Sequence, residues 1–113
     1  MTIQVFGTKK CKETAKAVRF FKERKIDIHI VDITEKGISE GEFNNIFRSV
    51  APEDLIDRDG REYEKNNLKY IQHNEKEVLL ENPLLVRTPI VRNGNRATAG
   101  YTPEIWTKWM AVK

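Results

Sequence analysis

The opening third of the chain alternates between strand-like and helix-like patterns, and this alternation most constrains the fold. Residues 3–7 are mainly β-branched or aromatic and end at a glycine, which predicts a short buried strand. Residues 10–24 carry apolar side chains at spacings of three and four, which predicts an amphipathic helix. A second β-branched run covers residues 28–33. A strand, a helix and a strand in such a short span favour parallel strands joined by a right-handed crossover.

The middle of the chain predicts helices and loops rather than strands. Ser39 is followed three positions later by an acid, which is a helix start signal, and helical spacing then continues to an end near Pro52. Residues 53–60 are mostly polar and predict a connecting loop. Shorter helices are expected around residues 63–70 and 75–81. This stretch is therefore a helical insertion between the opening unit and the last third.

The last third predicts a β-hairpin followed by a helix. Residues 90–92 and 96–98 are strand-like and flank Asn93-Gly94, a dipeptide suited to a tight turn. Thr102 is expected to cap a closing helix whose first position is a proline. Trp106 and Trp109 recur at helical spacing there, which indicates core packing rather than a ligand-stacking site.

Length and composition limit the class of protein. A chain of 113 residues, 39% hydrophobic and 33% charged, fits one globular domain over residues 1–113. Its net charge of +3 comes from residues of both signs scattered along the chain, so no block of like charge marks a nucleic-acid arm. Its single cysteine excludes an internal disulfide and fits a cytoplasmic location, and with two distant histidines it makes no metal site. We find neither a membrane-spanning stretch nor a secretory signal.

Cys11 is the residue most suited to chemistry. It follows the first predicted strand and begins the first predicted helix, which Thr8 is expected to cap. Backbone N–H groups and the positive end of the helix dipole would face its sulfur and favour the thiolate. Lysines surround it in the sequence, whereas a cysteine that only fills a core is expected among apolar neighbours. The position therefore favours a reactive thiol over a buried structural one.

Several motifs together resemble the arsenate reductase (ArsC) and Spx-like family over nearly the whole chain. They are Gly-Thr-Lys-Lys-Cys at residues 7–11, the segment of residues 83–91 around Thr88-Pro89, and residues 97–101 before the closing helix. The resemblance implies an α/β, thioredoxin-like fold: a mixed four-stranded sheet with a β-α-β start, a helical insertion, and a C-terminal β-hairpin and helix. It also implies a cis peptide at Thr88-Pro89 facing the Cys11 turn.

We expect Cys11 to be the catalytic residue, and the residues around it to bind substrate: Thr8, Lys10, Lys12, Thr88 and Pro89. The chain departs from the family pattern at two positions where arginines hold the oxyanion, because it has Thr88 and Tyr101 there. Neither side chain supplies the charged planar fork that binds a tetrahedral oxyanion, so arsenate is not the expected substrate. Thr14 stands where Spx-like regulators have their second cysteine, so an oxidised Cys11 needs a thiol from outside the chain.

The leading hypothesis is thus a monomeric thiol-based oxidoreductase. The thiol expected to resolve an oxidised Cys11 belongs to glutathione, glutaredoxin or thioredoxin. No bound cofactor is expected, although glutathione is a candidate co-substrate. Neither nucleic acid nor membrane is an expected partner. One alternative is an Spx-like regulator that binds RNA polymerase or another partner without catalysis. Another is a family remnant whose anion site has decayed. His29 and His73 are expected to be structural or exposed, and four arginines are expected to form a solvated surface: Arg58, Arg61, Arg92 and Arg96.

Overall fold

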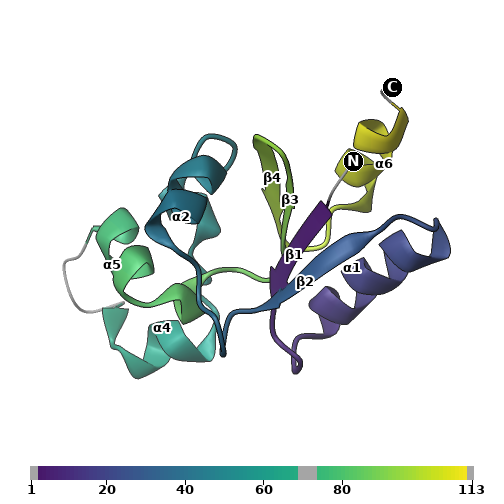
Figure 1. Ribbon diagram of the computed structural model, residues 1–113. Helices are drawn as coiled ribbons and strands as arrows, with labels where there is room; N and C mark the ends of the chain where they lie inside the picture. Colours follow the sequence, from purple (N-terminus) through teal and green to yellow (C-terminus); the bar gives the residue numbers. More distant parts are fainter. Residues whose placement is uncertain (1–2, 69–73, 112–113) are drawn as a thin grey trace.

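Four strands form a mixed sheet in the order β2-β1-β3-β4 in a computed structural model that describes residues 3–68 and 74–111 (Figure 1). β1 (Ile3–Gly7) lies parallel to β2 (Ile28–Asp32) and antiparallel to β3 (Ile90–Asn93). β3 pairs in turn with β4 (Arg96–Ala99) as a hairpin. The predicted parallel opening and the predicted hairpin are both confirmed.

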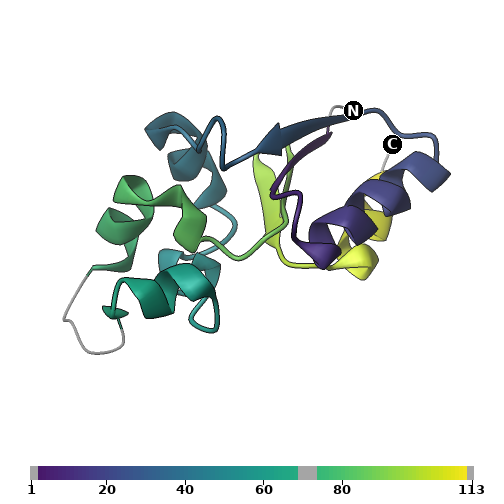
Figure 2. The same cartoon turned by 90° about the horizontal axis from the view of Figure 1, so that it is seen from below.

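Two helices, α1 (Lys12–Glu23) and α6 (Pro103–Ala111), cover one face of this sheet and lie side by side in Figure 2. Phe20 and Phe21 of α1 pack against Trp106 of α6, with ring centroids 5.3 and 5.1 Å away. The buried Trp106 indole N–H donates to the Thr98 hydroxyl of β4 at 2.8 Å, so the ring is buried without an unpaired donor. Trp106 and Trp109 therefore belong to the core, as predicted.

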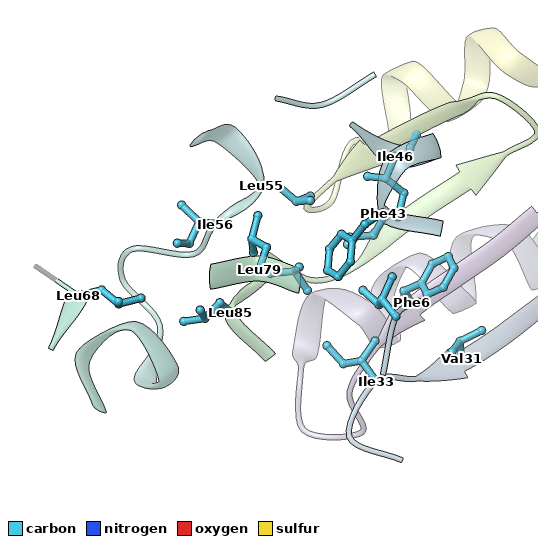
Figure 3. Packing of buried hydrophobic residues seen from close by; sticks show 14 residues of the cluster. Phe6, Val31, Ile33, Phe43, Ile46, Leu55, Ile56, Leu68, Leu79 and Leu85 are labelled. Carbon is cyan, nitrogen blue, oxygen red and sulfur yellow. The ribbon is translucent and has the colours of Figure 1, made fainter. Parts of the chain in front are cut away.

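The helical insertion packs against the other face of the sheet. It consists of α2 (Glu40–Ile46), α3 (Pro52–Leu55), α4 (Arg61–Lys65), α5 (Glu75–Glu81) and the 3₁₀ turn η2 (Pro83–Leu85). Figure 3 shows its core, in which Phe43 lies near Phe6 of β1 and Leu79 and Leu85 lie farther from the sheet. This second core holds the insertion on the sheet face opposite α1. Within the described ranges, no helix is long and apolar enough to cross a membrane.

Inside the insertion, two sequence-based predictions are wrong. α2 begins with the predicted capping box at Ser39 but ends at Ile46 instead of near Pro52. The loop predicted over residues 53–60 contains part of α3, and Leu55 and Ile56 there are fully buried. Pro52 starts α3 because the first position of a helix needs no backbone donor.

The short helices of the insertion were predicted with different success. The helix predicted over residues 75–81 is confirmed as α5. The one predicted over residues 63–70 is α4 over Arg61–Lys65, and its expected end, like His73, lies outside the described residues.

Two predicted helix caps and one predicted turn differ from those that the structure shows. Thr8 does not cap α1, because Cys11 itself is the N-cap residue, with extended backbone angles and no side-chain cap bond. The Thr102 hydroxyl has no hydrogen-bond partner among the described residues, so it does not cap α6. The hairpin turn falls one residue later than predicted: Asn93 pairs with Arg96, and Gly94 takes the left-handed conformation that a glycine allows.

Gly7 ends β1 directly against Thr14 of α1, and a Cβ atom at position 7 would collide with the Thr14 side chain. We expect Gly7→Ala to destabilise the protein by about 1–3 kcal/mol, because overpacking a filled space forces its neighbours to shift. The same change in a Thr14→Ala background should cost much less, since the space is then vacant. Chemical denaturation of the four proteins measures this coupling, and equal costs in both backgrounds would contradict it.

Candidate functional site

The sulfur of Cys11 lies at the N-terminal end of α1, directly after the turn that follows β1. The Cys11 N–H donates to the Thr8 carbonyl at 3.2 Å, and the Cys11 carbonyl accepts from the Ala15 N–H at 3.2 Å. These two bonds close the turn and start the helix. The thiol is partly exposed, so it faces both solvent and the free N–H groups of the first helical turn.

Thr88, which lies 77 residues further along the chain, contacts this sulfur. Its hydroxyl donates to Cys11 Sγ at 3.0 Å, and its carbonyl lies 3.8 Å from the same atom. The peptide bond to Pro89 is cis, the geometry that the family resemblance implies there. The Pro89 carbonyl accepts from the Gly100 N–H at 2.8 Å, and the next residue, Ile90, pairs with Phe6 of β1. Sheet pairing thus fixes Thr88 beside the turn that carries Cys11.

Thr14, in the first turn of α1, is the third residue of this site, together with Cys11 and Thr88. Its side chain is only 6% exposed, and its hydroxyl has no hydrogen-bond partner among the described residues while the thiol is neutral. A buried hydroxyl without a partner is uncommon, because it loses its hydration without compensation. A thiolate on Cys11 would accept this hydrogen bond.

The pKa of Cys11 is lowered relative to that of an ordinary cysteine. Burial raises this pKa, but hydrogen bonds to the thiolate from the side chains of Thr14 and Thr88 lower it, as do the backbone N–H groups of Thr14 and Glu13. The lowering contributions together exceed the effect of burial. More of the thiol is therefore ionised at neutral pH than for a free cysteine, and the thiolate is the nucleophilic form.

Two hollows border the turn that carries Cys11, and Cys11 itself lines the second of them. The first, which we call the charged cleft, has a volume of about 510 Å³ and is lined by residues that include Thr8, Lys10, Arg61 and Thr88. The second, which we call the apolar groove, has a volume of about 300 Å³ between α1 and β2. Its lining includes Cys11, Thr14, Ala15, Val18 and Ile30.

Asp32 at the end of β2 borders both hollows. Its carboxylate accepts from the Thr34 hydroxyl at 2.6 Å and from the Thr34 N–H at 2.9 Å. These bonds, and the nearby charge of Lys9, lower the pKa of Asp32. A fixed negative charge therefore stands opposite the lysines of the Cys11 turn.

The structure brings together most of the residues that the sequence proposed for this site. Thr8, Lys10 and Thr88 line the charged cleft next to Cys11. Lys12 is exposed at the first position of α1 and lines neither hollow, and Pro89 is buried next to Thr88. Sequence reasoning missed Thr14. A polar residue on the helix face predicted to pack inward was the signal that could have identified it.

Of the four arginines expected to form a solvated surface, Arg61 lines the charged cleft. Arg58 lies 3.8 Å from the Glu75 carboxylate and borders a different hollow together with Arg87. Arg92 donates to the side chains of Asn45 and Gln4, at 2.9 and 3.0 Å. The sequence could not single out Arg61, because the path of the insertion decides its position.

Tyr101, which stands where the family pattern has an arginine, is exposed and packs its ring against Trp106. The Lys16 ammonium lies 5.9 Å from the centre of this ring. In the described part of the chain, no group of three or more His, Cys, Asp or Glu residues could hold a metal ion.

A mixed β2-β1-β3-β4 sheet with a cysteine at the start of its first helix, beside the loop that precedes β3, defines a thioredoxin-like protein. The chain matches the ArsC family over residues 6–109. It therefore belongs to the ArsC family.

Solved structures agree with this fold. An ArsC-family-related protein from Bacteroides fragilis is 20% identical, with a TM-score of 0.83 over 96% of this chain and 97% of that one. An arsenate reductase from Vibrio cholerae is 18% identical, with a TM-score of 0.80 and coverage of 96% and 97%. An arsenate reductase-related protein from Brucella melitensis is 20% identical, with a TM-score of 0.69 and coverage of 99% and 97%. No curated protein sequence matches this chain.

The two threonines beside the sulfur can be tested by removing their hydroxyls without removing volume. We expect Thr14→Val and Thr88→Val each to raise the pKa of Cys11, because the thiolate loses a hydrogen-bond donor. At pH values below the pKa of Cys11, alkylation of this thiol by iodoacetamide should be about fivefold slower in each valine variant than in the wild type. This factor corresponds to roughly 1 kcal/mol of lost hydrogen bonding. Measured rate-against-pH curves should shift to higher pH, and Thr14→Ser and Thr88→Ser should restore them. An unchanged curve for both valine variants would exclude this role.

Proposed function

We propose that this protein is a thiol-based oxidoreductase in which the Cys11 thiolate attacks the disulfide of a substrate. The observation that carries the proposal is the position of Cys11 Sγ, partly exposed at the start of a 12-residue helix and 3.0 Å from the Thr88 hydroxyl. Helix dipole, N–H groups and two hydroxyls all stabilise negative charge at that one atom. Membership of the ArsC family supports a thiol-based redox protein.

In the first step the Cys11 thiolate attacks one sulfur of the substrate disulfide. A new bond joins Cys11 to that sulfur, the substrate disulfide breaks, and the other substrate sulfur leaves as a thiolate that takes up a proton. In the second step an external thiolate attacks the mixed disulfide and releases Cys11 as a thiolate. The chain has no second cysteine, so this thiol comes from glutathione, glutaredoxin or thioredoxin.

The proposed substrate-binding residues are those around the sulfur. Thr8, Lys10 and Thr88 line the charged cleft, Lys12 adds positive charge, and Pro89 holds the loop that presents Thr88. Arsenate fits this site poorly, since Thr88 and Tyr101 cannot replace two arginines and Arg61 is a single guanidinium. A disulfide needs no such clamp.

Steady-state turnover tests the proposal. We expect the protein to reduce the neutral bis(2-hydroxyethyl) disulfide with glutathione as reductant, and Cys11→Ser to lose this activity while keeping its fold. The rate should rise with pH and level off at a lower pH than for free cysteine, because the lowered pKa of Cys11 leaves it ionised there.

Mass spectrometry of the protein isolated from cells should also show a mixed disulfide on Cys11. If the protein shows no turnover and no mixed disulfide, and keeps the same protein partners after Cys11→Ser, a redox role is wrong. A regulatory binding role like that of Spx would then explain the partners.

A further inference from the structure

Contrary to the even scatter of charge expected above, the positive charge of the protein is concentrated in the segment that carries Cys11. Residues 9–25 contain eight lysines or arginines against two glutamates, which leaves 12 basic and 15 acidic residues in the rest of the chain. The insertion, residues 34–86, contains 12 acidic and seven basic residues. The two segments lie on opposite sides of the sheet, α1 on one and the insertion on the other (Figures 1 and 2). The net charge of +3 therefore conceals a basic side and an acidic side.

The exposed cations of α1 form a row along the helix that begins at Lys12, the residue after Cys11. Lys12, Lys16, Arg19 and Lys22 are all exposed along this helix, whereas its apolar residues Ala17, Phe20 and Phe21 are buried. At 1.5 Å per residue the row is about 15 Å long. We call Lys12, Lys16, Arg19 and Lys22 the basic row.

The apolar groove is lined by other residues of the same helix, among them Ala15 and Val18, and by Cys11. Val18 of α1 and Ile30 of β2 line it, and Ile30 is 50% exposed, the highest value among the exposed large hydrophobic residues of the described chain. Thr14 also lines it, and the buried Thr14 hydroxyl has no hydrogen-bond partner among the described residues. β2 is an edge strand that pairs only with β1 among the described strands.

We propose that the basic row and the apolar groove bind an acidic segment of a partner protein, and that this segment carries the disulfide attacked by Cys11. This inference rests on the proposed function of Cys11. Charge complementarity with the basic row favours an acidic partner, and the length of the row favours one longer than a tripeptide such as glutathione. The Asp32 carboxylate, which also lines the groove, accepts hydrogen bonds from Thr34. An extended peptide of five residues spans about 17 Å, which matches the row. An apolar side chain next to the partner cysteine occupies the groove beside Val18 and Ile30.

The reaction on this surface is the disulfide exchange described above. The Cys11 thiolate bonds to the partner sulfur that enters the site, and the second partner sulfur leaves as a thiolate and is protonated. The basic row adds no chemical step. It raises the local concentration of acidic partners and therefore the rate of encounter, an effect that salt weakens.

Mixed disulfides between thiopyridine and short synthetic peptides test this inference, because attack on the peptide sulfur releases pyridine-2-thione, which is followed by absorbance. Three peptides share one cysteine and one leucine beside it and differ in five flanking residues, which are acidic, neutral or basic. At low ionic strength we expect the acidic peptide to react at least tenfold faster than the basic one. The ratio should fall towards one as salt is added.

Charge reversal away from the sulfur separates a protein partner from a small anion. At about 0.15 M salt, where charges are screened beyond about 8 Å, Arg19→Glu/Lys22→Glu should slow the acidic peptide severalfold and change the rates of the neutral peptide and of the thiopyridyl disulfide of glutathione much less, because glutathione does not reach the far end of the row. Arg48→Glu/Lys76→Glu, on exposed positions of the insertion, is the matched control and should change none of these rates.

Equal rates for the three peptides would overturn the inference while leaving the proposed function intact. So would an equal loss for glutathione and the acidic peptide in Arg19→Glu/Lys22→Glu, which would indicate a small anionic substrate. Binding of duplex DNA to the wild type that Arg19→Glu/Lys22→Glu abolishes would mean that the row serves nucleic acid instead. Failure of all three peptides, the neutral one included, would overturn the proposed function together with the inference.

Discussion

The contact between the Thr88 hydroxyl and the sulfur of Cys11 connects the opening β-α-β unit to the C-terminal hairpin. One partner belongs to the turn after β1 and the other to the loop before β3, and the antiparallel pairing of these two strands sets their separation. The turn supplies the N-terminal end of α1, and the loop supplies the Thr88 hydroxyl that donates to the sulfur. The pairing of β1 with β3 thus assembles the site.

The two hollows at this site differ in charge and polarity. The charged cleft lies towards the insertion and contains Lys10, Arg61 and Asp32, whereas the apolar groove lies between α1 and β2. A substrate that reaches Cys11 therefore meets two different surfaces.

Local signals in the sequence were sufficient for the frame of the fold. The β-branched runs and the helical spacing of the first 33 residues, the hairpin around residues 93–94, and the capping box at Ser39 all correspond to observed elements. The errors fall where tertiary packing decides. The stretch that contains Leu55 and Ile56 is polar enough to predict a loop, yet both side chains are fully buried because the insertion needs them to close its core.

The sequence by itself determined that one cysteine stands where a strand passes into a helix, with lysines around it and no second thiol to resolve it. Only the tertiary structure decided which groups face that sulfur. Thr14 and Thr88 reach it, Arg61 borders the adjoining cleft, and Arg92 is held elsewhere by Asn45 and Gln4. The reason is physical: local patterns follow from backbone propensity and periodicity, whereas contacts between distant segments depend on how strands pair and cores pack.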